Sequence, residues 1–260
     1  MPILGFGTYG LSGKQAYNCA KEAIQLGYRM LDTAHMYGYE KEVGKAIRDS
    51  QVPRDQIFVV TKMDSRSNSY EKAKKQIDRS LSELGLTYID LYLIHEPYSQ
   101  SFEMWKALEE AYKQGKLKSI GISNFLGKRF TEFIKKVEIS PMVNQIEAHV
   151  YHQRLQVQKL FQENNVALMS WSPLIGGEVN FYEKPILNDL AKKYNKTVAQ
   201  IVLNYFVSRD IIVISRTSKK ESMIENKNIF DFTLTEDDIG QIQSLDKNQS
   251  LFSWAKQFEL

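Results

Sequence analysis

Four side chains that could move or steer a proton lie at or soon after the ends of short apolar runs. Asp32 ends one such run, and Tyr37 comes five residues later on an expected loop. Lys62 follows the run 57–61 (IFVVT), and His95 follows the run 89–94 (IDLYLI). We expect the four side chains to meet in one site.

A phenol next to an ammonium suits proton transfer to a carbonyl oxygen. A free tyrosine has a pKa of roughly 10, and a neighbouring cation lowers that pKa. Lys62 could supply this cation, Asp32 could hold Lys62 in place, and His95 could orient the carbonyl. Because none of these groups supplies electrons, the reaction would need a hydride-carrying cofactor, most simply a nicotinamide.

Taken singly, each of these residues also has a structural explanation. Tyr37 could be a half-buried loop aromatic, Asp32 could form a turn, and His95 could end a strand. Lys62 is harder to explain this way, because a charge directly after an apolar run would be buried without a partner. The set of four therefore favours a site over packing alone.

Short apolar strands alternate with amphipathic helices along the whole chain. Expected strands are 3–6, 29–31, 57–61, 89–94, 119–122, 142–146, 166–170 and 211–214. Expected helices are 14–26, 41–49, 70–84, 102–114, 127–135, 153–163 and 185–208, followed by a helix at 236–245 and a short tail. This alternation without a linker predicts one domain, 1–260, folded as a (β/α)8 TIM barrel.

Polar residues end the strand candidates one after another. They are Asp32, Lys62, His95, Ser123, Asn124, Gln145, Trp171, Ser172, Arg216 and Thr217. Barrel enzymes build their sites at the carboxyl ends of the strands. This placement predicts an active site on that rim.

Composition narrows the possible partners. The net charge of +3, from 34 basic and 31 acidic residues, gives no reason to expect nucleic acid or an anionic membrane as a partner. The lone Cys19 excludes an internal disulfide and is expected to be buried. With neither a signal peptide nor an apolar run long enough to span a bilayer, we expect a cytoplasmic protein.

Three other chemistries find little support in the motifs. The run 5–10 (GFGTYG) matches the glycine pattern of a dinucleotide-binding loop, but only a stub of strand precedes it. We favour instead a tight first barrel turn, with Thr8 and Tyr9 near a cofactor. A serine hydrolase typically carries a G-x-S-x-G elbow, and a metal site typically carries a ligand motif such as HExxH or CxxC. The sequence contains none of these.

The chain resembles the aldo-keto reductases over nearly its whole length. The matching stretches include MPILGFGTYG, LDTAHMYGYEKEVGKAI, FVVTKM, IDLYLIHEP, VNQIEAHVY, SWSPL and SRTSKKESMIEN. The resemblance is to bacterial-type members akin to diketogluconate and prostaglandin-F-synthase-like reductases. It implies a monomeric barrel that reduces aldehydes and ketones with NADPH, with NADH as the alternative, bound across the carboxyl-terminal rim.

The resemblance also assigns roles. Tyr37 would be the general acid, tuned by Lys62 and Asp32, with His95 orienting the substrate. The residues implied in cofactor binding are Thr8, Tyr9, Asp32, Ser123, Asn124, Gln145, Trp171, Ser172, Pro173, Leu174, Ser215, Arg216, Thr217, Glu225 and Asn226. Among them, Trp171 would stack on the nicotinamide, and Arg216 with Thr217 would grip the 2′-phosphate.

The sequence departs from the family pattern at several points. Glu96 stands where a tryptophan is common, Ser215 replaces a proline, and Ser222 replaces a frequent arginine. The Ser222 change weakens the preference for NADPH, although Arg216 still offers a bidentate phosphate fork. The chain also starts at what is usually an internal point, so we expect the N-terminal hairpin that plugs the barrel floor to be absent or trimmed.

Short connections around the expected site predict a shallow, open pocket. Its candidate walls are Tyr9, Met36, Glu96, Phe181, Phe252 and Trp254. Small aldehydes, dicarbonyls such as methylglyoxal, or keto sugars would fit. Two alternatives stay open at this point: a cofactor-binding accessory or regulatory barrel with little catalysis, and a barrel hydrolase that needs no nicotinamide.

Overall fold

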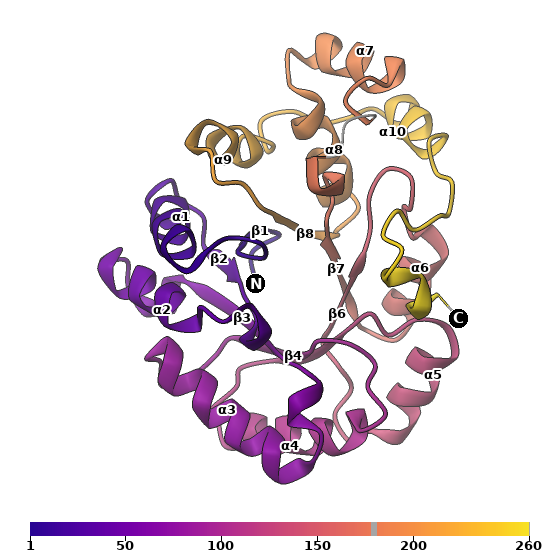
Figure 1. Cartoon of the computed structure of the whole chain (residues 1–260). Coiled ribbons are helices and arrows are strands. Elements are labelled where there is room, and N and C mark those ends of the chain that lie inside the picture. The colour runs from indigo at the N-terminus through magenta and orange to yellow at the C-terminus, as the bar shows by residue number, and fades with distance from the viewer. Residues whose placement is uncertain (178–180, 260) are drawn as a thin grey trace.

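The strands form a closed barrel at the centre of the molecule. A computed structural model describes residues 1–177 and 181–259. In these residues parallel strands pair in sequence order, and the last strand pairs with the first (Figure 1). The strands are β1 (Leu4–Gly7), β2 (Met30–Asp32), β3 (Phe58–Met63), β4 (Leu91–Ile94), β5 (Ile120–Ser123), β6 (Val143–Glu147), β7 (Ala167–Trp171) and β8 (Ile212–Ser215). The predicted (β/α)8 barrel is confirmed.

Helices surround the barrel, as Figure 1 shows. They are α1 (Gly13–Gln25), α2 (Glu40–Asp49), α3 (Tyr70–Leu84), α4 (Ser101–Lys113), α5 (Gly127–Lys136), α6 (Leu155–Glu163), α7 (Pro185–Tyr194), α8 (Val198–Val207), α9 (Lys220–Lys227) and α10 (Glu236–Gln243). Short 3-10 turns include η1 (His35–Tyr37), η2 (Arg54–Gln56), η3 (Ser65–Ser67), η4 (Ile175–Gly177) and η6 (Ala255–Phe258). No described helix has the length and apolar character needed to cross a membrane.

The prediction of one helix over 185–208 is wrong, because this stretch forms α7 and α8. Asn195 ends α7 in the left-handed conformation, with φ of 52°. Thr197 then caps α8 by accepting a hydrogen bond from the Gln200 amide, and the Gln200 side chain completes a capping box. A left-handed residue followed by an N-cap ends one helix and starts the next. The helix α9 was not expected from the sequence.

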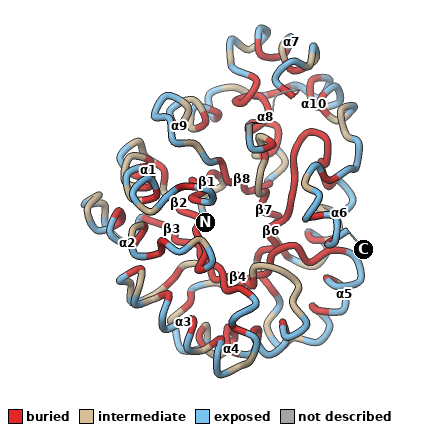
Figure 2. The backbone as a smooth tube through the Cα atoms, viewed as in Figure 1, coloured by how far each residue is buried: buried red, intermediate tan, exposed pale blue. Residues whose placement is uncertain are grey.

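The strands are buried on both faces. One apolar cluster fills the barrel interior and consists of Met30, Val60, Leu91, Leu93, Val143, Met169, Ile212 and Ile214. A second, larger cluster lies between the strands and the helices. Figure 2 shows buried backbone along the strands and exposed backbone on the outer helices. This two-sided burial explains why most strand positions are apolar. The lone Cys19 is buried in α1, as expected.

Candidate active site

The structure brings the four predicted proton-handling side chains to one end of the barrel. Asp32 is the last residue of β2, Tyr37 ends the turn η1, and His95 directly follows β4. Lys62 lies inside β3, one residue before its end, whereas the sequence pattern placed it just after the strand. Because the strands are parallel, their carboxyl ends share one rim, and the four residues become neighbours there.

Lys62 and Asp32 form a buried ion pair. The Lys62 side chain is 1% exposed, and its Nζ donates to Asp32 Oδ1 at 2.6 Å and to the Thr33 carbonyl at 3.0 Å. The other Asp32 oxygen accepts a hydrogen bond from Gln145 Nε2 at 2.8 Å. A buried charge needs such partners, because desolvation otherwise costs several kcal/mol per ion, about as much as the pair regains.

Tyr37 lies over this ion pair. The Lys62 ammonium is 5.4 Å from the centre of the Tyr37 ring. The His95 ring meets the Tyr37 ring edge-on, with centroids 5.7 Å apart, and the Tyr9 ring lies 5.2 Å away on a loop. The phenol is therefore enclosed by the groups that the sequence predicted as its partners, and by one further tyrosine.

The expectation that Lys62 lowers the pKa of Tyr37 is not met in this structure. Burial raises the Tyr37 pKa well above its ordinary value, and the Asp32 carboxylate raises it further. The Lys62 charge is offset because Asp32 sits 2.6 Å from the ammonium. Burial also lowers the pKa of Lys62 in spite of Asp32. Tyr37 is therefore a protonated phenol at neutral pH, as a free tyrosine is, and the raised pKa makes it a weaker acid than free tyrosine.

His95 is a neutral imidazole. Burial, assisted by the nearby Lys62 charge, lowers its pKa to about 3. Its Nδ1 atom is buried and has no hydrogen-bond partner among the described residues. A neutral ring can donate one hydrogen bond without bringing a competing charge to the site.

A second group of predicted residues lines the rim from β5 to β7. Asn124 has φ of 64° and Ser172 has φ of 54°, a strained conformation that often marks functional sites. Asn124 Oδ1 accepts a hydrogen bond from Trp171 Nε1 at 2.9 Å, and Ser123 Oγ donates to the Gln145 carbonyl at 2.8 Å. Next to Ser172, Pro173 is buried and Leu174 packs against the core.

A third group lies near β1 and after β8. Thr8 is buried and donates to the Asp32 carbonyl at 2.9 Å. Ser215 is buried, while Arg216 is exposed beside the loop at Gly10 and makes no ion pair within residues 1–177 and 181–259. Thr217 Oγ1 accepts from the Lys219 amide at 3.1 Å.

The two residues predicted to contact adenine lie on α9, and neither side chain is fully available to a ligand. Glu225 already accepts a hydrogen bond from Thr197 Oγ1 at 2.6 Å. Asn226 is buried, with 3% of its surface exposed. An adenine contact from Glu225 would share the carboxylate with Thr197.

The residues predicted to line the pocket differ in how far they are exposed. Tyr9, Met36 and Trp254 are exposed, and Glu96 and Phe252 are partly buried. Burial raises the pKa of Glu96, which has no ion-pair partner in the described part of the chain. Phe181 packs in the core beside Tyr182, with 1% of its surface exposed, and so offers no surface to a ligand in this structure.

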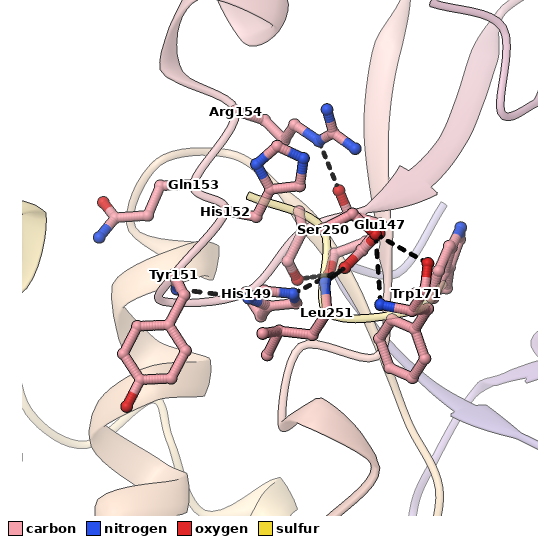
Figure 3. Close-up of polar contacts among 12 residues, drawn as sticks. Glu147, His149, Tyr151, His152, Gln153, Arg154, Trp171, Ser250 and Leu251 are labelled. Carbon is pink, nitrogen blue, oxygen red and sulfur yellow. Dashed lines mark hydrogen bonds and ion pairs between the residues drawn. The ribbon is translucent and has the colours of Figure 1, made fainter. Parts of the chain in front are cut away.

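Sequence reasoning missed a polar network beside the site, drawn in Figure 3. Glu147 ends β6, 1% exposed, and binds His149 together with Ser250 and Leu251 from the chain's last residues. The available signal was the run 147–154 (EAHVYHQR), which begins at the strand end and is rich in polar residues. Their partners lie about a hundred residues further on, so no local pattern revealed them.

Comparisons with known proteins agree with the barrel fold. The sequence profile of the Aldo/keto reductase family matches residues 3–247. The 9,11-endoperoxide prostaglandin H2 reductase of Trypanosoma cruzi (strain CL Brener) is 40% identical over 254 residues, which cover 96% of this chain and 90% of that protein. The glyoxal reductase of Bacillus subtilis (strain 168) is 37% identical over 251 residues, with 96% and 90% covered.

A solved structure points the same way. The aldo-keto reductase of Bombyx mori in complex with NADP superposes with a TM-score of 0.92 and 30% identity, covering 98% of this chain and 92% of that one. Each of these matches spans nearly the full length of both proteins, well beyond a shared barrel scaffold. The chain therefore belongs to the aldo/keto reductase family.

Proposed function

We propose that the protein reduces small aldehydes and dicarbonyls to alcohols with NADPH, with Tyr37 as the proton donor. The observation that carries this proposal is the convergence of a protonated phenol, a neutral imidazole and a buried ion pair at one rim. Tyr37 and His95 meet edge-on at 5.7 Å, above Lys62 paired to Asp32 at 2.6 Å. The glyoxal reductase among the relatives supports the substrate class.

The chain's own residues fit a nicotinamide cofactor. Gln145 uses Nε2 on Asp32 and has no hydrogen bond on Oε1 from any described residue, so Oε1 can accept from a carboxamide. Trp171 is held by Asn124 and offers an indole for stacking. The guanidinium of Arg216, which has no ion-pair partner among the described residues, suits a 2′-phosphate. The complex of the Bombyx mori relative with NADP supports this choice of cofactor.

Each residue has a separate task in the reduction. A reduced nicotinamide held by Gln145, Trp171 and Arg216 would supply the hydride for the carbonyl carbon. His95 donates a hydrogen bond that orients the carbonyl oxygen, and Tyr37 donates its proton to that oxygen as negative charge develops. Lys62, 5.4 Å from the Tyr37 ring, lies beside the phenolate left behind, although Asp32 offsets part of its charge, and solvent then returns the proton to Tyr37.

Loss of reduced-nicotinamide absorbance tests this proposal. The protein would be mixed with NADPH or NADH and with glyoxal or methylglyoxal. We expect turnover with NADPH, and Tyr37→Phe should lower kcat by about 10²- to 10⁴-fold, the usual worth of a positioned general acid. Cofactor binding, followed by tryptophan fluorescence, should be unchanged in this variant.

A matched control uses a tyrosine away from the rim. Tyr112 on α4 is partly buried in the outer core, so Tyr112→Phe should keep its turnover. If Tyr37→Phe turned over like Tyr112→Phe, the role of Tyr37 would be refuted. Cofactor binding without turnover in the unaltered protein would favour an accessory barrel, and the absence of cofactor binding would refute the proposal as a whole.

A further inference from the structure

Two anchors hold the last residues of the chain against the rim. We call residues 250–259 the C-terminal strap. The first anchor is the Glu147 carboxylate, which accepts hydrogen bonds from His149 Nε2 at 2.8 Å, Ser250 Oγ at 2.7 Å and the Leu251 amide at 3.0 Å (Figure 3). Burial raises the pKa of Glu147, but these donors outweigh burial and leave that pKa lowered. The anchor is thus an anion whose partners include the start of the strap.

The second anchor holds the other end of the strap. Arg154 binds Glu259 with two parallel hydrogen bonds of 2.8 and 2.5 Å, and His152 Nε2 lies 3.2 Å from the same carboxylate. Hydrogen bonds from His152 and Arg154 overcome the effect of burial and lower the Glu259 pKa to about 2. A bidentate pair with one partner almost fully buried is stronger than an ordinary surface ion pair.

Both anchors are built on the end of β6. The Arg154 side chain is 3% exposed, and its Nε donates to the backbone carbonyl of Glu147 at 2.7 Å. The Arg154 backbone is itself left-handed, with φ of 59°. The same strand end therefore fixes the first and the last residue of the strap.

Between the anchors the strap covers Trp171. The Trp254 ring stacks on Trp171 with centroids 5.2 Å apart and an angle of 16° between the planes. The Phe252 ring meets Trp171 edge-on at 5.2 Å. Ala255 and Phe258 are buried and tie the turn η6 to the core. Trp254 remains 49% exposed, so little of its own surface is buried. Its position against Trp171 therefore depends mainly on the two anchors.

We propose that Glu147 and the Arg154–Glu259 pair are positioning residues that hold Trp254 against one face of Trp171. The stack, together with the hydrogen bond from Trp171 to Asn124, fixes the indole plane and leaves the other face for the nicotinamide. This part of the inference rests on the proposed function. Releasing the strap would let both indoles turn, which weakens ligand binding while leaving the proton transfer at Tyr37 unaffected.

Fluorine NMR of protein labelled with fluorotryptophan tests the positioning without cofactor or substrate. The chain has three tryptophans, and the third, Trp105, is buried and hydrogen-bonded to the Ile139 carbonyl. Stacked indoles shift each other's resonances through their ring currents. Glu259→Ala should move the Trp171 and Trp254 resonances and leave that of Trp105 in place. Ser250→Ala, which removes one donor from Glu147, should move the same two.

A matched control breaks an ion pair elsewhere. Asp78 pairs with Lys116 at 2.6 Å, far along the chain from the strap, and Asp78→Ala should move none of the three resonances. Unchanged Trp171 and Trp254 resonances in both Glu259→Ala and Ser250→Ala would overturn the proposal. Movement of all three would indicate general loosening and would overturn it as well.

Steady-state kinetics supply a second readout, specific to action through Trp254. Glu259→Ala should raise KM for NADPH roughly 3- to 10-fold, equivalent to losing one good contact, with kcat nearly unchanged. In a Trp254→Ala background Glu259→Ala should add no further rise, whereas additive effects would contradict action through Trp254. The unaltered protein could show no turnover while Glu259→Ala and Ser250→Ala still move the two resonances. That result would refute the proposed function and support the positioning role of the anchors.

Discussion

The buried pair of Lys62 and Asp32 gives the sharpest test of the site's energetics. Lys62→Met removes the ammonium and leaves the Asp32 carboxylate 4% exposed, with Gln145 as its only remaining side-chain partner among the described residues. Removing one member of a buried pair costs about 3–5 kcal/mol, because the other charge is left uncompensated. We therefore expect the free energy of unfolding to fall by about that amount.

Urea unfolding followed by circular dichroism measures this loss. The double variant Lys62→Met with Asp32→Asn should recover most of the stability, since no unpaired charge remains, while activity stays lost. As a control, Lys116→Met breaks the more exposed pair with Asp78 and should cost less than about 1 kcal/mol. A Lys62→Met protein as stable as the Lys116→Met protein would refute the reasoning.

Three further predictions concern charge around the site. Arg216→Ala should raise Kd for NADPH at least about tenfold and change Kd for NADH little, because the guanidinium would face only the 2′-phosphate; equal losses in fluorescence titrations would exclude that role. Burial lowers the pKa of His95 from 6.5 to about 3 in the folded protein. As pH falls from 6.5 to about 3, the unfolded chain binds a proton at this histidine and the folded protein does not, so stability is lost over this interval. His95→Gln should therefore lose less stability than the unaltered protein between about pH 7 and about pH 4, and identical acid unfolding curves would contradict the assignment. Glu96→Gln should improve kcat/KM for a carbonyl substrate bearing a carboxylate more than for methylglyoxal, because an unpaired carboxylate repels the anion; an equal change for both would place Glu96 outside the pocket.

Much of the fold and of the site could be predicted from local patterns. Apolar runs gave all eight strands to within one or two residues, because burial on both faces makes most strand positions apolar. Asp32, Lys62 and His95 near strand ends predicted a shared rim, because parallel strands in a barrel put their carboxyl ends together. The break between α7 and α8 also has a local signal, since Asn195 favours the left-handed conformation and Thr197 is a good N-cap. The apolar pattern continues across the break, so it predicts one helix.

The sequence by itself determined the barrel and the family, and it singled out the four residues that we propose handle the proton. Only the tertiary structure decided how the pKa values of Tyr37 and His95 shift, because burial and the Asp32 carboxylate raise that of Tyr37, and burial lowers that of His95 to about 3. It also decided where the last residues of the chain lie. The contact of Glu147 with Ser250 and the stack of Trp254 on Trp171 join segments far apart in sequence, and such pairings depend on the closed barrel rather than on any local pattern.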